Sequence, residues 1–490
     1  MLAKALSVHY IVDMIVYSKE IGTPIELNPM PNDLKIIEMY IDIKHLDPEK
    51  ITNNRLLEAY NKFKFSKEYV VGIFEDLINN PQVKIGEEYI GILEWILQRN
   101  QQQNYSFGIA DFTEMAGSFA VFEVLGIEKT FDVSPSIILP ADFQFFGINI
   151  VKEIREGNTV IPALNFAKPG DWIFTQDGGC HFKLERFMRN LNEHKRQISS
   201  NKKFYQNAVS KILAKTLKIR RENWGEYFFN LFNKISYHFV NQHEYANFEN
   251  CPKDDRIVYI GGILVEENEE NLNLTSNKYE DASLVLVAFG TLNLNAGMTL
   301  YDVNFMLNKF TQCSDYQFKI KLPPGYNLPN TSNIEITDEF IEQQQILFDP
   351  NTKFFISHCG QNSLTEAIYA GVPLICIPNS GDQFYNSSLV EQLGIGIYVS
   401  LLWIDNNGEH RNPYFGNEFT KALNEIQELS EKNLGLGIGL DYLGFGYLGI
   451  WIVYGLNLIV ISGLHLSPFM IHFLTWNSYC TVSGMFSVQI

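Results

Sequence analysis

Short apolar runs alternate with amphipathic segments along the second half of the chain. Leu284–Phe289 is a continuous apolar run that ends in Gly290-Thr291, which is typical of a strand buried on both faces. The same pattern predicts strands at Tyr316–Leu322, Lys353–Ser357 and Pro373–Ile377, and helices at Thr299–Phe310, Asn362–Ala370 and Gln383–Leu393. Strands that alternate with helices in this way predict a parallel, doubly wound sheet.

The first part of the chain shows a weaker alternation. Helices are predicted at Leu2–Leu6, Lys67–Leu77, Glu87–Leu97 and Met115–Leu125, and strands at Ile11–Tyr17, Ser106–Ala110 and Lys129–Val133. These segments form βαβ units. Residues 150–245 are helix-prone without a clear period, and the acidic, Asn-rich stretch Glu266–Asp281 is predicted to be a loop. Because a chain of 490 residues can bury two cores, we expect two α/β domains.

The composition is that of a folded protein with an acidic surface. Hydrophobic residues make up 46% and charged residues 19%, which excludes a disordered chain. The net charge of −18 argues against a nucleic-acid surface, since phosphate binding requires a concentration of Lys and Arg. The six cysteines lack CxxC and CxxH spacing, so neither a zinc site nor a disulfide scaffold is expected.

The stretch Gly444–Leu464 contains 21 residues without a charge, which is long enough to span a bilayer. Its Tyr, Asn and Gly residues make it only moderately hydrophobic, so a buried tail is the alternative. The length criterion favours a transmembrane segment.

One stretch combines features that suit a nucleotide diphosphate. After the strand that ends at Ser357, the chain reads His358-Cys-Gly360-Gln-Asn362-Ser363-Leu-Thr-Glu366. Gly360 allows backbone to approach a ligand, and the helix that follows offers free N–H groups and the positive end of its dipole. The Asn-Ser pair can cap the helix or reach phosphate oxygens, and Glu366 can accept from vicinal sugar hydroxyls.

This stretch, with Asp382-Gln383 after the next strand, resembles the signature of the UDP-glycosyltransferase family, which includes the animal glucuronosyltransferases. The resemblance implies a diphosphate site at His358, Gly360 and the Asn362-Ser363 pair. It also implies that Glu366 holds the ribose, and that Asp382 and Gln383 contact hydroxyls of the donor sugar. It extends over roughly Leu2–Leu423.

Three further donor-site residues follow from the same resemblance. The family signature begins with Trp-x-Pro-Gln, and this chain has Phe340-Ile-Glu342-Gln343 at that place. Phe340 can stack on uracil with less area than Trp. Gly290-Thr291 resembles a family loop whose hydroxyl lies near the diphosphate, which adds Thr291 to the predicted site.

The catalytic half is less complete. In the family a His after the first strand takes the acceptor proton, and an Asp orients it; the resemblance gives the latter role to Asp111, which could equally be a helix N-cap. The His has no counterpart, because the chain resembles the family only from inside the first helix. The segment with this His and a signal peptide is therefore expected to lie upstream. Without this base, we expect the chain to transfer sugar at a rate near background. His45 is the remaining alternative for the base.

The resemblance implies a GT-B fold, in which two Rossmann-like domains face each other across a cleft. We expect an acceptor domain at residues 1–255 that lacks its first strand, a UDP-sugar domain at 256–432, and an atypical tail at 433–490. The implied reaction moves a glucuronosyl or glucosyl group to a small lipophilic acceptor, with inversion and without a metal or other cofactor. The Phe-rich stretch Phe143–Phe146 would suit such an acceptor or belong to the core.

Two alternatives remain. One is a partner subunit that binds UDP-sugar but lacks the base, and the other is a UDP-sugar epimerase of the same architecture. The resemblance further implies a location in the endoplasmic reticulum membrane with lumenal domains. It leaves homo- or hetero-oligomers open.

Overall fold

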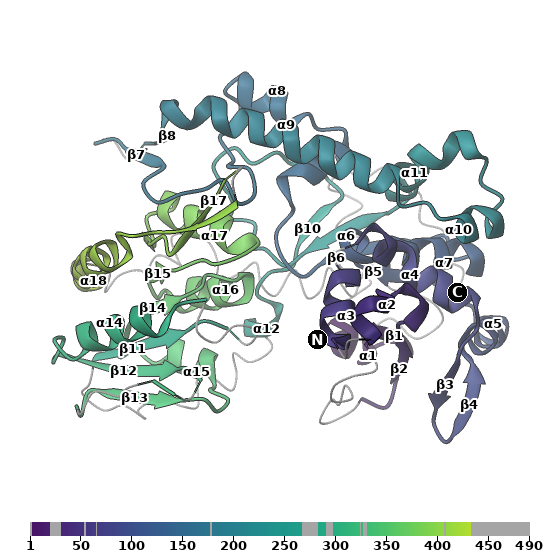
Figure 1. The fold of residues 1–490 in the computed structure, drawn as a ribbon, viewed down its shortest axis with the longest axis horizontal. Coiled ribbons are helices and arrows are strands. Elements are labelled where there is room, and N and C mark those ends of the chain that lie inside the picture. The colour runs from purple at the N-terminus through teal and green to yellow at the C-terminus, as the bar shows by residue number, and fades with distance from the viewer. Residues whose placement is uncertain are drawn as a thin grey trace, which may run out of the picture.

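A computed structural model of the chain describes residues 2–19, 31–52, 55–64, 66–176, 179–266, 283–290, 297–323, 325–326, 331–405 and 408–432. Figure 1 shows an α/β protein with two groups of strands, one in the first half (residues 2–266) and one in the second half (residues 283–432). The predicted loop Glu266–Asp281, all but its first residue, and the apolar stretch Gly444–Leu464 lie outside the described residues. None of the helices in the described ranges is long and apolar enough to cross a membrane.

The second half contains the parallel sheet that the sequence predicts. Its six strands are all paired in parallel, in the order β13-β12-β11-β14-β15-β16. The elements are β11 (Ser283–Ala288), α14 (Leu300–Phe310), β12 (Tyr316–Lys321), β13 (Ile334–Thr337), α15 (Gln343–Leu347), β14 (Thr352–Ser357), α16 (Gln361–Ala370), β15 (Leu374–Cys376), α17 (Asp382–Gln392), β16 (Gly396–Tyr398), β17 (Leu402–Asp405), β18 (Gly408–Arg411) and α18 (Phe415–Lys432).

Strand β11 explains why the apolar pattern was continuous. Val285 and Val287 pack into one hydrophobic cluster with α14 and α18, whereas Leu284, Leu286 and Ala288 pack into a second cluster on the opposite face. Because successive side chains of a strand point to opposite faces, a strand with a core on each side requires apolar residues at every position. The predicted interpretation of Leu284–Phe289 is confirmed.

The first half has its strands in separate sheets. β5 (Gly108–Ala110), β6 (Thr130–Ser134), β9 (Tyr237–Val240) and β10 (Ile257–Tyr259) form a parallel sheet of order β10-β9-β6-β5, while β1 (Val12–Ser18) and β2 (Leu34–Tyr40) form a parallel pair. Two hairpins are added, β3 (Gln82–Ile85) with β4 (Glu88–Gly91) and β7 (Trp172–Phe174) with β8 (Cys180–Phe182).

Helices, most of them short, surround these strands. They are α1 (Leu2–Ser7), η1 (Ile43–His45), α2 (Pro48–Thr52), α3 (Leu56–Lys64), α4 (Lys67–Ile78), α5 (Ile92–Gln102), α6 (Phe112–Met115), α7 (Gly117–Leu125), η2 (Pro140–Phe146), α8 (Ile150–Arg155), α9 (Leu184–Gln206), α10 (Lys211–Thr216), η3 (Arg221–Glu226), α11 (Tyr227–Asn233) and α12 (Ile263–Glu266).

Two predicted boundaries in the first half are wrong. The helix expected at Glu87–Leu97 begins only at Ile92, because Gly86, with a φ of +66°, turns the chain between two short strands. The domain boundary expected after residue 255 falls one strand too early, because β10 pairs with β9 of the first-half sheet.

A long helix and several hydrogen bonds connect the two halves of the chain. Helix α9 runs along the top of Figure 1 and reaches both cores, with Leu191 in the cluster on one face of the second-half sheet and Tyr205 in the first-half cluster. The Trp172 indole N–H donates to Ser388 Oγ at 3.0 Å, and the Tyr398 hydroxyl donates to the Ala167 carbonyl at 3.0 Å. The region 150–245, which showed no clear period, thus connects the halves.

Candidate functional site

The carboxyl edges of the two main sheets face each other. Ser136 follows β6 in the first half, and its hydroxyl donates to Oδ2 of Asp382, the first residue of α17, at 2.5 Å. Asn241 follows β9, and its Nδ2 donates to Asn362 Oδ1 of α16 at 2.7 Å. Ligands of open parallel sheets bind beyond the carboxyl ends of strands, so this is the expected place for a site.

His358 lies between two glycines at this edge. A Cβ at Gly360 would stand 2.6 Å from His358 Nε2, and a Cβ at Gly290 would stand 2.9 Å from the same atom, so only glycine fits beside the ring. Burial lowers the pKa of His358 to about 4, which leaves the imidazole neutral at pH 7. Its Nδ1 is buried without a hydrogen-bond partner in the part of the chain that the structure describes. Such an atom is available to a ligand.

The N-terminus of α16 points into the same region. Gly360 is its N-cap residue and supplies no side-chain cap, so the first N–H groups depend on other partners. The exposed amide of Asn362 lies beside them, and Ser363 Oγ is buried and accepts from Gln343 Nε2 at 3.1 Å. The Gln361 N–H is bonded to the Asp382 carboxyl. A helix N-terminus without a cap from its own N-cap residue, flanked by these side chains, suits an anion such as a diphosphate.

Glu366 is fixed by two glutamines of α15. Gln343 Nε2 donates to its Oε2 at 2.6 Å and Gln344 Nε2 donates to its Oε1 at 3.2 Å. Burial raises the pKa of Glu366, while both amides counteract this by stabilising the carboxylate. The carboxylate is therefore oriented before a ligand arrives. Gln343, predicted to bind the donor, acts here through Glu366 and Ser363.

Phe340 offers an open aromatic face. Its side chain is 77% exposed, although it precedes a helix that packs on the core. Lys321, the last residue of β12, places Nζ 5.7 Å from the ring centroid, within cation–π range. An exposed ring at the rim of an anion site can stack on a base.

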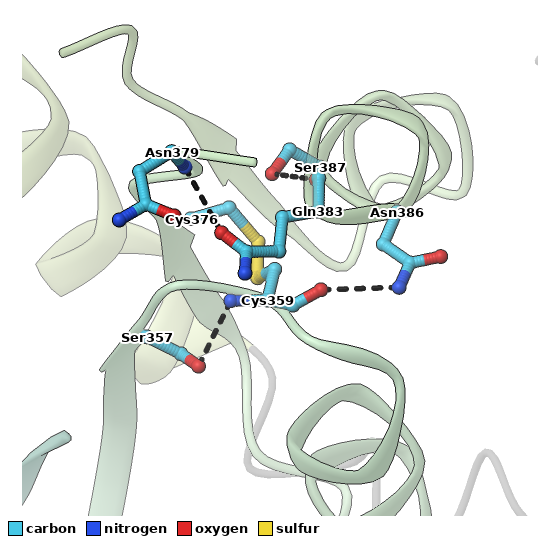
Figure 2. Close-up of a disulfide and its surroundings, with 7 residues drawn as sticks. All are labelled: Ser357, Cys359, Cys376, Asn379, Gln383, Asn386 and Ser387. Carbon is cyan, nitrogen blue, oxygen red and sulfur yellow. Dashed lines mark hydrogen bonds between the residues drawn. A yellow bond between two sulfur atoms is a disulfide. The ribbon is translucent and has the colours of Figure 1, made fainter. Parts of the chain in front are cut away.

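Gln383 does not point freely into the site. Its Oε1 accepts from the N–H groups of Asn379 at 2.9 Å and Ser380 at 3.3 Å, so the side chain braces its own loop (Figure 2). Asp382 is held by Ser136, and burial raises the pKa of its carboxyl. A sugar hydroxyl that reaches these residues would have to compete with those bonds.

Asp111 caps a helix, as the alternative interpretation had it. It follows β5, and its Oδ1 accepts from the Glu114 N–H at 3.1 Å at the start of α6. Burial and the nearby Asp132 raise the pKa of Asp111 to about 7. None of the histidines in the described ranges is hydrogen-bonded to it. The buried His238 pairs instead with Asp132, at 2.9 Å.

His45 has a carboxylate partner that the sequence did not reveal. Its Nε2 lies 2.7 Å from Oδ1 of the buried Asp76 on α4, and its ring stacks on Phe63. Asp76 also accepts from the Tyr17 hydroxyl at 2.8 Å and from the Asp42 N–H at 3.0 Å. With this many donors, Asp76 anchors the segment after β2.

The structure thus gathers most of the predicted donor residues at one edge and leaves Thr291 and the stretch Phe143–Phe146 outside it. Thr291 and its loop lie outside the described residues, although the preceding Gly290 touches His358. Phe143 and Phe145 are buried in the core and do not line a site. No cluster of three metal-ligating side chains occurs in the described ranges.

Several contributors were missed. Lys321 and Gln344 have no distinctive sequence context, and Ser136 and Asn241 come from the other half of the chain. Cys359 and Cys376 form a disulfide, which the cysteine spacing did not indicate (Figure 2). The spacing is uninformative because adjacency of β14 and β15 brings the two residues together.

Comparison with known proteins agrees with this geometry. Residues 191–408 match the model of the family described as UDP-glucoronosyl and UDP-glucosyl transferase. The chain is 32% identical over 151 residues to human UDP-glucuronosyltransferase 3A1, a match that covers 29% of this chain and 28% of the relative. It is 30% identical over 192 residues to the ecdysteroid UDP-glucosyltransferase of Lacanobia oleracea granulosis virus, covering 38% and 39%.

A longer match is to ugt-55 of Caenorhabditis elegans, at 26% identity over 62% of this chain and 54% of the relative. The chain thus matches less than two thirds of the length of these relatives. The matched part of the chain is thus similar to UDP-glycosyltransferases.

Solved structures show the same fold. Os79 from O. sativa in complex with UDP superposes with a TM-score of 0.52 at 14% identity, covering 93% of this chain and 95% of that one. Phytolacca americana UGT2, complexed with UDP-2fluoro-glucose and pterostilbene, gives 0.50 at 14% identity, covering 98% and 94%.

Proposed function

We propose that this chain is a glycosyltransferase that binds a UDP-sugar in its second half and transfers the sugar to a small lipophilic acceptor bound by its first half. The observation that carries the proposal is the convergence around α16. Three groups lie at one sheet edge: the α16 N-terminus, which Gly360 does not cap, the oriented carboxylate of Glu366, and His358 Nδ1, which has no partner among the described residues. This arrangement supports a diphosphate site at the helix N-terminus and a ribose site at Glu366, which is the order that UDP requires.

The proposed reaction is a direct displacement. An acceptor oxygen or nitrogen attacks the anomeric carbon of a glucuronosyl or glucosyl group, the bond to the UDP oxygen breaks, and configuration inverts. Hydrogen bonds from the α16 N-terminus and from neutral His358 would stabilise the charge that develops on UDP, without a metal or other cofactor. The match of residues 191–408 to the family model supports this class of chemistry.

The donor site is tested by calorimetry with UDP. We expect Glu366→Ala to weaken UDP binding by about 1–3 kcal/mol, the scale for losing a hydrogen bond to a charged group. The matched control is Glu335→Ala, at an exposed position of the edge strand β13, and it should leave the UDP affinity unchanged. Unchanged UDP affinity in both Glu366→Ala and His358→Ala would refute the site.

A partner subunit that binds UDP-sugar without transferring it is the second candidate. It is favoured by one observation, the helix-capping role of Asp111, whose carboxylate is bonded to Glu114 N–H and to no histidine in the described ranges. Release of UDP in the presence of phenolic acceptors supports the transferase, and binding without release supports the partner subunit. Conversion of UDP-glucose to another UDP-sugar would instead indicate an epimerase.

We further propose that the protein acts on the lumenal side of the endoplasmic reticulum membrane. Family resemblance and the length of the apolar stretch Gly444–Leu464 support this. The full chain should resist alkaline carbonate extraction, and a variant ending at Lys432 should be released. Recovery of the full chain in the soluble fraction would contradict the proposal.

A further inference from the structure

A disulfide lies directly beneath the proposed diphosphate loop. It joins Cys359, the residue between His358 and Gly360, to Cys376, the last residue of β15. Both cysteines are fully buried (Figure 2). The remaining described cysteines, Cys180, Cys251 and Cys313, are free.

Cys359 has a backbone conformation that side chains disfavour. Its φ is +59°, in the left-handed region, which costs a residue with a Cβ about 1–2 kcal/mol. Two hydrogen bonds hold it there. Its N–H donates to Ser357 Oγ at 3.0 Å, and its carbonyl accepts from Asn386 Nδ2 of α17 at 3.1 Å (Figure 2).

The direction of the loop at Cys359 decides where its neighbours lie. His358 fits only because Gly290 and Gly360 approach its ring, and Gly360 begins α16. A change of φ at Cys359 would move the imidazole relative to the helix N-terminus, because the two flank that residue. Both are the groups assigned to the diphosphate.

We propose that Cys359 and Cys376 are a positioning pair, whose disulfide holds the diphosphate loop in its binding conformation and makes donor binding depend on redox state. The proposal rests on the proposed UDP site. When only a fraction of molecules has the competent loop, the apparent dissociation constant rises by the inverse of that fraction.

A dithiol reagent supplies all the electrons and protons needed to reduce the Cys359–Cys376 disulfide. Dithiothreitol gives two electrons and two protons to the sulfur atoms, which become two thiols, and closes to its own cyclic disulfide. Since both cysteines are fully buried, the loop must open before the reagent reaches them. Bound UDP, which stabilises the closed loop, should therefore slow the reduction.

The test compares UDP affinity of the full chain in four forms: oxidised wild type, Cys376→Ala, Cys359→Ala and Cys359→Gly. We expect Cys376→Ala and Cys359→Ala to bind UDP about 5- to 30-fold more weakly, which corresponds to about 1–2 kcal/mol for the left-handed residue. Cys359→Gly also lacks the disulfide, but glycine adopts this φ freely, so it should retain more of the affinity. A merely structural disulfide would lower the melting temperature of all variants and leave UDP affinity unchanged.

Reduction supplies the second arm. Dithiothreitol should weaken UDP binding to wild type and to the control Cys313→Ser, and should not affect Cys376→Ala. Alkylation and mass spectrometry should show two additional thiols, formed more slowly with saturating UDP. Equal UDP affinity in all forms, or two alkylated cysteines at these positions in freshly purified protein, would overturn the proposal. Failure of oxidised wild type to bind UDP would overturn the proposed function instead.

Discussion

The Ser136 hydroxyl donates to Asp382 Oδ2 at 2.5 Å and so joins the carboxyl edge of the first-half sheet to the first residue of α17. The acceptor in this bond is the carboxylate that family resemblance assigns to the donor sugar. Asn241 and Asn362 repeat the arrangement one helix away. The first half therefore contacts the proposed donor site at two points, and a donor sugar bound there would have to share or replace the bond to Ser136.

The role of Asp382 can be separated from that of the nucleotide residues. We expect Asp382→Asn to weaken UDP-sugar by about 1–3 kcal/mol, because it removes a charge-assisted hydrogen bond to a sugar hydroxyl. UDP alone lacks the transferred hexosyl group, so its affinity should change much less than that of UDP-sugar. Calorimetry with both ligands checks this, and an equal loss for UDP and UDP-sugar would show that Asp382 holds the nucleotide.

Gly360 should be intolerant of any side chain. In Gly360→Ala the new Cβ would meet His358 Nε2 at 2.6 Å, so the imidazole or the helix start must move. We expect UDP binding to fall at least about tenfold, about 1.4 kcal/mol, while the far-UV spectrum stays native. Gly225→Ala is the matched control, since its Cβ meets only Gln206 Cγ at 3.9 Å. Wild-type UDP affinity in Gly360→Ala would contradict the placement of His358.

Stability should fall as pH rises towards neutrality, because of a buried carboxyl. Burial raises the pKa of Asp142 to about 7, while Asn201 Nδ2 donates to it and Asp132 and Asp111 lie nearby. Above the ordinary pKa of 3.8 and up to about 7, the folded protein keeps a proton that the unfolded chain has lost. The free energy of unfolding therefore decreases as pH rises through this range.

The isosteric Asp142→Asn removes this cost. We expect the variant to melt above wild type at pH 7.5, and the difference to shrink at pH 4.5, where the wild-type carboxyl is already protonated in the fold. Differential scanning calorimetry checks this, with the exposed Asp315→Asn as control. A difference that is constant with pH would show that Asp142 does not titrate in this range.

The second-half sheet and the α16 loop could be predicted because their signals are local. Each strand there is a buried apolar run, and the loop and helix start lie within a few residues. The disulfide and the contacts of Ser136 and Asn241 could not be predicted. Their partners come together only when strands pair and the two halves of the chain pack together. Ser136 and Asp382 are 246 positions apart, and Asn241 and Asn362 are 121 apart.

The first half was predicted less well for a different reason. Its main hydrophobic cluster draws single residues from many helices and their connections, so the apolar pattern along the chain is interrupted. Strand β2 does have a usable signal, since Leu34, Ile37 and Met39 are buried while Lys35 is exposed. It is nevertheless absent from the predicted strands, because it has only seven residues and lies beside polar loops. The contact of His45 with Asp76 could not be predicted from the sequence, because the two residues are 31 positions apart.

The last prediction concerns the proton of the acceptor. Asp111 follows β5 at the same sheet edge as Ser136 and Asn241, and a pKa of about 7 makes its carboxylate a competent base near neutrality. If wild-type transfer exceeds the near-background rate expected without the family's His, we expect Asp111→Asn to lower it by up to about 10²–10⁴-fold, the usual contribution of a general base, with UDP affinity unchanged. The ionised form is required, so the wild-type rate should increase as pH rises through about 7.

His45→Ala is the comparison. Because Asp76 anchors a segment through His45, this change should lower the melting temperature and leave the transfer rate unchanged. If His45→Ala abolishes transfer without affecting UDP binding, while Asp111→Asn remains active, the His45–Asp76 pair is the base and Asp111 only caps its helix.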